Sequence, residues 1–482
     1  MAKQPMLKFV NVPREMPTKR EATERREDFN EIYAEYADAK AKEQASRCSQ
    51  CGVPYCQSHC PLHNNIPDWL RLTAEGRLQE AYEVSQATNT FPEICGRICP
   101  QDRLCEGNCV IEQSDHGTVT IGSVEKYITD TAWEEGWVQP IKPAAERGES
   151  VGIIGAGPGG LAAADVLRRA GVQVTVYDRY DRSGGLLTYG IPGFKLEKDV
   201  VMRRNEQLEQ GGVRFVLNCN VGGTGPSDLS FDDIRAQHDA VIIATGVYKS
   251  RDLGGPGAGA EGIVKALDYL TASNRAANFG DSVPEFESGA LNAEGKRIVV
   301  IGGGDTAMDC VRTAIRQGAT SVKCLYRRDR ANMPGSQREV QNAEEEGVQF
   351  EWLTAPVGFK GDPVNAVVVQ RMRLGLPDAT GRQSPEVIEG SDYDEPADLV
   401  IKALGFEPEE LPNLWGQPEL AVTRWGTVKA EFTTGRTDMD GVYAIGDIVR
   451  GASLVVWAIR DGRDCAEAIL ADIAAKGAVA AE

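Results

Sequence analysis

Apolar and polar positions follow two different patterns along the chain, and the change falls near residue 150. In residues 21–47 and 66–89, aromatic and aliphatic side chains recur at helical spacing among charged ones, which predicts amphipathic helices. From residue 151 onward, short apolar runs such as 151–154 and 297–301 are followed by glycine-rich turns and segments with helical spacing. The pattern predicts an α/β protein in which an N-terminal α-helical domain precedes two Rossmann-like nucleotide-binding domains.

The first apolar run opens a complete dinucleotide-binding pattern. The segment VGIIGAGPGGLAAADVLRRAGVQVTVYDR contains Gly155, Gly157 and Gly160 in the G-x-G-x-x-G spacing, and Asp178 ends the second strand. The glycines permit a tight turn, a close approach to a pyrophosphate and close helix packing, while an acid at the second strand end can bind ribose hydroxyls. A purely structural turn is the alternative, but strand, turn, helix, strand and acid in this order favour a nucleotide site.

The same pattern recurs at KRIVVIGGGDTAMDCVRTAIRQGATSVKCLYRR with a different strand end. Gly302, Gly304 and Ala307 form the fingerprint, and the second strand ends in Arg327 and Arg328 instead of an acid. Guanidinium groups pair with a 2'-phosphate that a carboxylate would repel, so this site is expected to prefer NADPH over NADH. The alternative is that both arginines are solvated surface charges. Two dinucleotide sites with these endings suggest a flavin and a nicotinamide that meet face to face.

Eight of the twelve cysteines lie between residues 48 and 109, in RCSQCGVPYCQSHCP and ICGRICPQDRLCEGNC. Zinc sites usually show two short C-x2-C pairs, whereas irregular compact runs ending in Cys-Pro are typical of 4Fe-4S clusters. Zinc and disulfides are the alternatives, and disulfides are not expected in a cytosolic chain. The four other cysteines, Cys219, Cys310, Cys324 and Cys465, are expected to be small buried hydrophobes.

Charge and hydropathy narrow the possible partners and location. The formal net charge of -19 argues against a nucleic-acid or anionic-membrane partner, because both require a basic face. No run approaches the roughly 18 apolar residues of a membrane span, and the first residues lack the apolar core of a signal peptide. A cytoplasmic location is therefore expected.

The motifs GAGPGG, GGLLTYGIPGFKL, ATG, GGGDTAMD and YAIGD resemble those of glutathione-reductase-type flavoproteins. Together with QASRCSQCGVPYCQSHCPLHNNIPDWL, they resemble the family of small (β) subunits of bacterial NADPH-dependent glutamate synthases over essentially the whole chain. In that family the NADPH domain is inserted into a discontinuous FAD domain. The resemblance implies a 4Fe-4S domain at 1–145, an FAD domain at 146–290 and 406–482, and an NADPH domain at 291–405.

The resemblance also implies the cofactor-binding residues. The first glycine turn is expected to hold the FAD pyrophosphate, Asp178 its adenosine ribose, Gly185 and Leu186 its isoalloxazine, and Asp447 its ribityl and phosphate side. The helix after Gly451 is expected to direct its positive end at the flavin. The residues expected around FAD are Gly155, Ala156, Gly157, Pro158, Gly159, Gly160, Asp178, Gly185, Leu186, Ala244, Thr245, Gly246, Gly446 and Asp447. Those expected around NADPH are Gly302, Gly303, Gly304, Asp305, Thr306, Ala307, Arg327 and Arg328.

Two 4Fe-4S clusters are expected, with a crossed ligand pattern carried over from related dehydrogenases. One cluster would use Cys48, Cys51, Cys56 and Cys109, and the other Cys60, Cys99, Cys105 and Glu125. The alternative is the simple count of eight cysteines, in which Cys95 takes the place of Glu125.

The expected function is electron input. Hydride passes from NADPH to FAD without an amino-acid acid, base or nucleophile, so no catalytic residue is assigned, and single electrons then leave through the clusters. The resemblance implies a hetero-oligomer with a large (α) subunit that carries glutaminase and FMN sites and makes L-glutamate from L-glutamine and 2-oxoglutarate. The alternatives are a module for another acceptor, as in NADH-dependent ferredoxin:NADP oxidoreductase, and a zinc-stabilised scaffold with a degenerate flavin fold.

Overall fold

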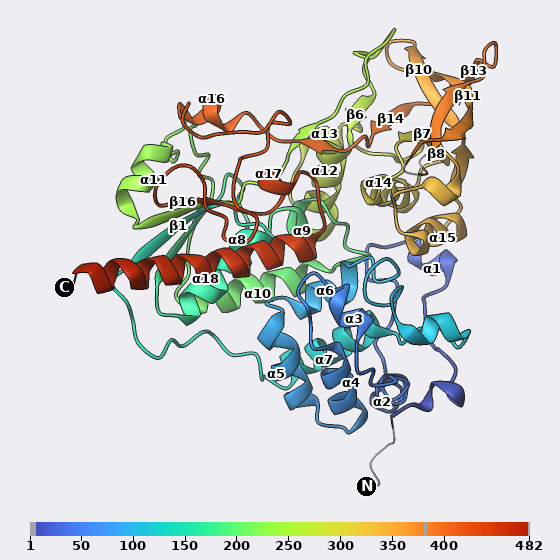
Figure 1. Ribbon diagram of the computed structural model, residues 1–482. Coiled ribbons are helices and arrows are strands. Elements are labelled where there is room, and N and C mark those ends of the chain that lie inside the picture. The colour runs from blue at the N-terminus through green and yellow to red at the C-terminus, as the bar shows by residue number, and fades with distance from the viewer. Residues whose placement is uncertain (1–5, 380, 382, 481–482) are drawn as a thin grey trace.

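The computed structural model describes residues 6–379, 381 and 383–480, and its N-terminal part is helical (Figure 1). The core of this part surrounds the fully buried Trp69 and includes Leu70, Val124 and Ile128. Its helices are η1 Lys8–Val10, α1 Ala22–Arg25, α2 Asp38–Ala45, α3 Tyr55–Ser58, α4 Ile66–Ala74, α5 Leu78–Thr88, α6 Pro92–Ile98, η2 Val110–Ser114 and α7 Ile121–Glu134.

One helix prediction was wrong in part, because residues 26–37 lie outside the helices on either side of them. This segment lies between the helical domain, where Glu31 pairs with Arg97 and Lys126, and the nucleotide-binding part of the chain. Arg25, at its start, is buried and forms ion pairs with Glu345 and Glu346, and the amide of Ile32 donates to the carbonyl of Phe194. Contacts with a distant part of the chain override the local helical pattern.

The first parallel sheet is built from two separate parts of the chain. Its strand order is β16-β4-β1-β2-β3, and β16 comes from the C-terminal region while the other four precede residue 250. The long C-terminal helix α18 packs along α8, where Gly462 lies so close that a Cβ there would stand 2.2 Å from the Gly159 carbonyl oxygen. The strands are β1 Ser150–Ile154, β2 Gln173–Tyr177, β3 Arg214–Val216, β4 Ala240–Ile243 and β16 Val442–Ala444, and the helices α8 Pro158–Arg169, α10 Lys198–Gln210, α11 Phe231–Gln237 and α18 Val455–Ala480.

The second parallel sheet lies between these two parts in the sequence. Its strand order is β6-β14-β7-β8-β9, in which β7 carries the second glycine turn. The strands are β6 Ile263–Lys265, β7 Arg297–Ile301, β8 Ser321–Tyr326, β9 Gln349–Trp352 and β14 Leu399–Lys402, and the helices α12 Ala266–Phe279, α14 Asp305–Arg316 and α15 Gln337–Glu345. Strand β6 pairs with β14 although it precedes residue 291, so the domain limits from the sequence stay a prediction.

Two short strands, β5 Lys249–Ser250 and β15 Phe406–Glu407, pair antiparallel where the chain passes between the two sheets. An antiparallel sheet that the sequence analysis did not predict is attached to the second nucleotide-binding unit; it comprises β10 Thr354–Lys360, β11 Ala366–Pro377, β12 Gln383–Val387 and β13 Tyr393–Pro396. The remaining short helices are α9 Leu186–Tyr189, α13 Pro284–Glu287, η3 Arg330–Asn332, α16 Leu411–Trp415 and α17 Asp447–Arg450.

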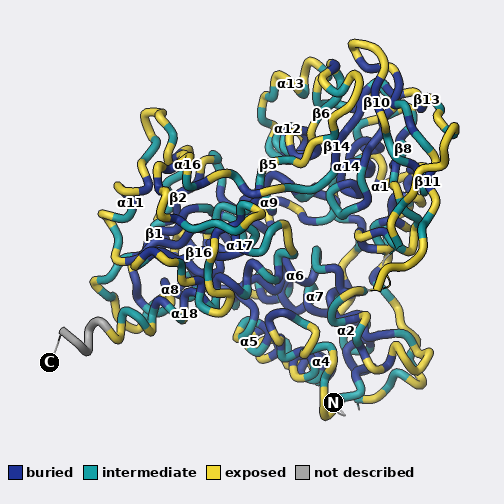
Figure 2. The backbone as a smooth tube through the Cα atoms, turned by 45° about the horizontal axis from the view of Figure 1, so that its top comes forward, coloured by how far each residue is buried: buried dark blue, intermediate teal, exposed yellow. Residues whose placement is uncertain are grey.

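Buried residues follow the strands of the two parallel sheets and the helices of the N-terminal domain (Figure 2). The helical domain lies beside both nucleotide-binding units in Figure 1, so the loops of all three can meet between them. Among the described residues, we find no helix with both the length and the apolar character needed to cross a membrane.

Candidate functional site

The turn after β1 has the backbone geometry of a phosphate-binding loop. Gly155 has a φ of +116°, and a Cβ there would lie 2.3 Å from the carbonyl oxygen of Ala244, so only glycine fits. Gly157 is the N-cap of α8, and no atom lies within 4 Å of the position its Cβ would take. Free space in front of unpaired helix N–H groups is what a pyrophosphate requires.

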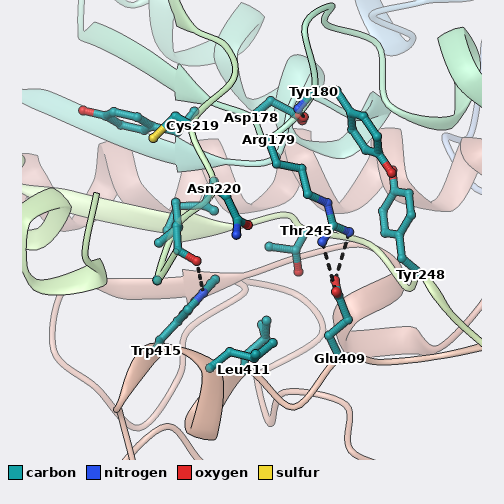
Figure 3. A pocket seen from close by; sticks show the side chains of 16 residues that line it. Asp178, Arg179, Tyr180, Cys219, Asn220, Thr245, Tyr248, Glu409, Leu411 and Trp415 are labelled. Carbon is teal, nitrogen blue, oxygen red and sulfur yellow. Dashed lines mark hydrogen bonds and ion pairs between the residues drawn. The ribbon is translucent and has the colours of Figure 1, made fainter. Parts of the chain in front are cut away.

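The end of β2 borders a cavity of about 150 Å3 (Figure 3). Asp178 lies in its wall, where its two carboxylate oxygens accept hydrogen bonds from the amides of Ala156, at 2.7 Å, and Tyr180, at 2.9 Å. Burial raises the pKa of Asp178. The carboxylate therefore holds the glycine turn to the end of β2, at the position where an adenosine ribose would lie.

Three residues of this cavity were missed by the sequence analysis. Arg179 forms two 3.0 Å hydrogen bonds with Glu409, and its guanidinium lies 4.6 Å from the centre of the Tyr248 ring (Figure 3). An aromatic ring and a paired guanidinium form a flat wall suited to an adenine ring. No local sequence pattern could have predicted that these residues lie together, because they come from three separate segments.

Neighbouring strand ends bring the other expected FAD residues together. Because β4 and β16 are parallel neighbours, the turns that follow them, with Ala244, Thr245 and Gly246 on one and Gly446 and Asp447 on the other, lie at the same edge of the sheet. Burial raises the pKa of Asp447 to about 6.

Gly185 joins this group by close contact. It has a φ of 55°, and a Cβ there would lie 2.9 Å from the Cα of Gly157. Gly185 therefore packs directly on the first glycine turn, which places the following Leu186 next to the same site.

The second glycine turn repeats the geometry of the first. A Cβ on Gly302 would lie 2.2 Å from the carbonyl oxygen of Ala403, whereas the corresponding space at Gly304 is open. Gly303, Asp305, Thr306 and Ala307 continue the turn into α14.

Arg327 and Arg328 follow β8 directly, the first exposed and the second partly buried. Within the described part of the chain, neither guanidinium forms an ion pair or hydrogen bond, and Nε of Arg328 is buried. Both cationic groups are thus free to meet an anionic group at this strand end, as a 2'-phosphate would require.

The first group of cysteines lines one small cavity of the helical domain. Cys48, Cys51, Cys56 and Cys109 all face it, although Cys109 is far from the others in sequence. Burial raises the pKa of Cys48 to about 11 and that of Cys56 to about 12. Four thiols around one buried space match the donor set of a 4Fe-4S cluster, whose irons favour the thiolate form.

The second group also converges. Burial, with smaller contributions from nearby Cys95 and Glu125, raises the pKa of Cys60 to about 12. A hydrogen bond with Cys95 and burial raise the pKa of Cys99, and burial raises that of Cys105; Glu125 contributes to both. Glu125 and Cys95 thus both lie near these thiols, so the identity of the eighth ligand stays a prediction.

Glu125 is a buried carboxylate with an uneven set of contacts. Its Oε1 accepts hydrogen bonds from Asn64, at 3.0 Å, and Asn89, at 3.3 Å, whereas no donor of the described chain bonds to Oε2. Burial raises its pKa to about 8. A carboxylate with one oxygen held and the other available has the chemistry of an iron ligand.

A second cavity, of about 250 Å3, connects all three sites. Cys99 and Gln101 of the helical domain, Leu186 of the first nucleotide-binding unit, and Asp305 and Thr306 of the second all line it. Leu454 and Val455, at the start of α18, complete the wall on the flavin side. The arrangement brings residues expected at the flavin, the nicotinamide and a cluster around one space.

An ion pair in this cavity was also missed by the sequence analysis. Lys195 Nζ lies 2.9 Å from the Asp309 carboxylate and 4.0 Å from that of Glu339. The three residues come from different elements, which only the fold brings together.

The fold and these sites define an FAD- and NADPH-dependent oxidoreductase with a 4Fe-4S domain. Residues 149–462 match the family model described as pyridine nucleotide-disulphide oxidoreductase, and residues 25–137 match the one described as dihydropyrimidine dehydrogenase domain II, 4Fe-4S cluster. The chain is 67% identical to the glutamate synthase [NADPH] small chain of Azospirillum brasilense, over 100% of both chains. It is 46% identical to that of Escherichia coli K12, over 97% of this chain and 98% of the other. The chain belongs to the glutamate synthase [NADPH] small chain family.

Two further similarities concern the fold and a longer relative. The solved structure of Mycobacterium tuberculosis FprA with NADPH shares the fold, with a TM-score of 0.58 and 21% identity over 69% of this chain and 86% of that one. The putative oxidoreductase AegA of Escherichia coli K12 is 46% identical over 94% of this chain, which spans 69% of that longer protein. The predicted family, fold class and NADPH-dependent oxidoreductase activity are confirmed, as are FAD, NADPH and 4Fe-4S chemistry.

Proposed function

We propose that this chain is the electron-input subunit of a glutamate synthase, with two 4Fe-4S clusters, and that it delivers electrons from NADPH to a separate large subunit. FAD, when bound, accepts a hydride from NADPH and releases electrons one at a time, as a 4Fe-4S cluster requires. The protein contributes binding, orientation and exclusion of water. No side chain is assigned as an acid, base or nucleophile.

The cavity between the three domains is the observation that carries this proposal. Leu186 and Val455 border the flavin side, Thr306 the nicotinamide side, and Cys99 the cluster side of one space of about 250 Å3. Electron transfer between a nicotinamide, a flavin and a cluster requires short separations without solvent between them. A shared cavity lined by residues proposed for all three sites supports such an arrangement.

The site residues keep the roles that the resemblance implied. We assign the FAD pyrophosphate to the turn from Gly155 to Gly160 and the NADPH phosphates to the turn from Gly302 to Ala307, each at the start of a helix. Asp178 braces the first turn and borders the adenosine ribose, and Arg327 and Arg328 pair with the 2'-phosphate.

The clusters are proposed to act in sequence. Cys60, Cys99, Cys105 and Glu125 would hold a cluster on the flavin side, because Cys99 lines the shared cavity. The cluster of Cys48, Cys51, Cys56 and Cys109 occupies a different cavity, bordered by Tyr55 and Val110, which are exposed. Electrons would therefore enter at the cluster bound by Cys60 and leave at the cluster bound by Cys48.

The proposed partner is a large (α) subunit with glutaminase and FMN sites, which makes L-glutamate from L-glutamine and 2-oxoglutarate. Similarity over the full length of proteins named small chains supports this partner. The similarity to AegA supports the alternative that such a module serves another acceptor.

The test is reconstitution. The purified chain is assayed for NADPH oxidation with glutamine and 2-oxoglutarate, alone and with the candidate large subunit. Glutamate that forms only with both chains supports the proposal, whereas NADPH oxidation by the chain with neither association nor glutamate formation would favour another acceptor.

A further inference from the structure

The loop from Met333 to Ser336 and the first turn of α15, which contains Arg338, connect the second glycine turn to the helical domain. On one side, the amide of Gly335 donates to the carbonyl of Gly303, at 3.0 Å, and the amide of Ser336 donates to the Asp305 carboxylate, also at 3.0 Å. The loop is thus hydrogen-bonded to the turn at which NADPH phosphates are proposed to bind. A change in that turn on nucleotide binding acts directly on the loop.

On its other side, the same loop is bonded to the cysteine loop between Cys99 and Cys105. The Ser336 hydroxyl donates to the Asp102 carboxylate, at 3.3 and 3.4 Å, and the Arg103 guanidinium donates to the carbonyl of Pro334, at 2.5 Å. These contacts join the NADPH-binding unit to the segment that carries Cys99 and Cys105. Both are proposed ligands of the second cluster, which is the one held by Cys60, Cys99, Cys105 and Glu125.

Arg338 makes the most extensive of these contacts. It donates to Gln101 Oε1 at 2.9 Å and to Glu106 Oε2 at 3.1 Å. Both acceptors are almost completely buried, with exposed fractions of 3% for Gln101 and 1% for Glu106. A guanidinium that donates to two different buried acceptors has a fixed position, unlike a solvated surface arginine.

The two partners of Arg338 support the other proposed ligands of this cluster. Gln101 Nε2 donates to the carbonyls of Cys95 and Gly96, at 3.1 Å each, near the end of α6 and just before Cys99. Glu106 Oε1 accepts from the amide of Gly122, at 3.1 Å, in the first turn of α7, the helix that carries Glu125. One side chain of the NADPH-binding unit therefore reaches the supports of Cys99, Cys105 and Glu125.

We infer that Arg338 is a positioning residue for the second cluster, and that nucleotide binding at the second glycine turn changes the redox equilibrium of that cluster through Ser336 and Arg338. The inference rests on the proposed ligand set. Hydrogen bonds and charge near a cluster set its potential, so a displaced guanidinium changes the ratio of reduced to oxidised cluster. The enzyme would thus adjust electron transfer from the flavin to this cluster to the presence of NADPH.

The test uses the full-length chain with its cofactors and 2'-phosphoadenosine 5'-diphosphoribose, which carries the phosphates of NADPH but no nicotinamide and cannot be reduced as a nicotinamide. The ratio of reduced to oxidised cluster is measured by EPR at fixed applied potentials, with and without the analogue. In the unmodified protein, the analogue is expected to change this ratio about threefold or more for one cluster and to leave the other nearly unchanged.

Variants separate positioning from a passive contact between domains. Arg338→Met should abolish the change in ratio while the analogue still binds, Arg338→Lys should restore part of it, and Ser336→Ala should reduce it. Arg373→Met is the matched control, because Arg373 pairs with Glu386, at 3.1 Å, in the antiparallel sheet of the same unit. This control should keep the full response.

Each outcome decides the inference. No change in ratio with the analogue bound to the unmodified protein, or a full change in Arg338→Met, would overturn it. If the Arg338→Met protein instead loses about half of its iron, the positioning role of Arg338 is supported. The effect of the analogue on the cluster is then judged from Ser336→Ala. Failure of the two-cluster proposal is distinguishable, since the unmodified protein would then contain about four irons per chain.

Discussion

The eighth cluster ligand offers a test in which the two candidates predict opposite results. Cys95→Ala and Glu125→Ala each remove one candidate donor from the group around Cys60 and Cys99. If Glu125 binds iron, the cysteine variant keeps both clusters and the glutamate variant loses or alters one.

A loss of stability does not by itself show which of the two residues binds iron. Truncating Glu125 leaves the amides of Asn64 and Asn89 without an acceptor, and each unsatisfied buried donor costs about 1–3 kcal/mol. The total of about 2–6 kcal/mol arises whether or not iron is bound. Removal of the buried Cys95 sulfur costs less, on the order of 1 kcal/mol. A control that disturbs the same contacts without removing a ligand is therefore needed.

Asn89→Ala is that control, because it removes one of the two hydrogen bonds to Glu125 and leaves the carboxylate in place. Iron and acid-labile sulfide are measured per chain, together with the EPR spectrum of the reduced protein. We expect about eight irons in the unmodified protein, Cys95→Ala and Asn89→Ala, and clearly fewer irons or a changed spectrum in Glu125→Ala. Loss of about four irons in Cys95→Ala with full retention in Glu125→Ala would refute the assignment.

Three further predictions follow from the same sites. Replacing Arg327 and Arg328 with Ala should raise the KM for NADPH more than tenfold, because each charge-assisted contact contributes about 1.5–3 kcal/mol. The KM for NADH should stay nearly unchanged. An equal rise in both KM values would contradict the preference for NADPH. The isolated chain should reduce ferricyanide with NADPH but form no glutamate from glutamine and 2-oxoglutarate, and glutamate detected without a partner would exclude the proposed division of labour. Burial would raise the pKa of Glu346, but its ion pairs with Arg312 and Arg316 lower the pKa to about 2. These ion pairs therefore stabilise the fold fully above about pH 4.5, and the stabilisation is lost as the pH falls toward 2. Glu346→Gln should therefore lower the Tm at pH 7 and have a smaller effect below pH 4; an equal decrease at both pH values would count against this role.

Local patterns in the sequence predicted both nucleotide-binding turns. Gly155 and Gly302 have positive φ values and lie against the carbonyls of Ala244 and Ala403, so glycine is required by short-range geometry. The strand that follows each turn and helix then brings Asp178 or Arg327 to the same edge of the sheet. Such features depend on neighbours in the chain or in the sheet, and the sequence displays them directly.

Local sequence patterns could not predict the contacts between distant segments. The pair of Lys195 with Asp309 and the contacts of Arg338 with Gln101 and Glu106 join residues from different domains. Each is an ordinary charged or polar residue in its local sequence, where a solvated position is the usual expectation.

The sequence by itself determined the fold class, the two glycine turns and the cysteine-rich segment, because each depends on local spacing and on a backbone geometry that few residues allow. Only the tertiary structure decided that Cys99, Leu186 and Thr306 border one cavity and that residues 26–37 contact Phe194 of the first nucleotide-binding unit instead of forming a helix. The physical reason is that burial and hydrogen bonding across domains, as at Ile32 with Phe194, outweigh helix propensities of a few tenths of a kcal/mol per residue.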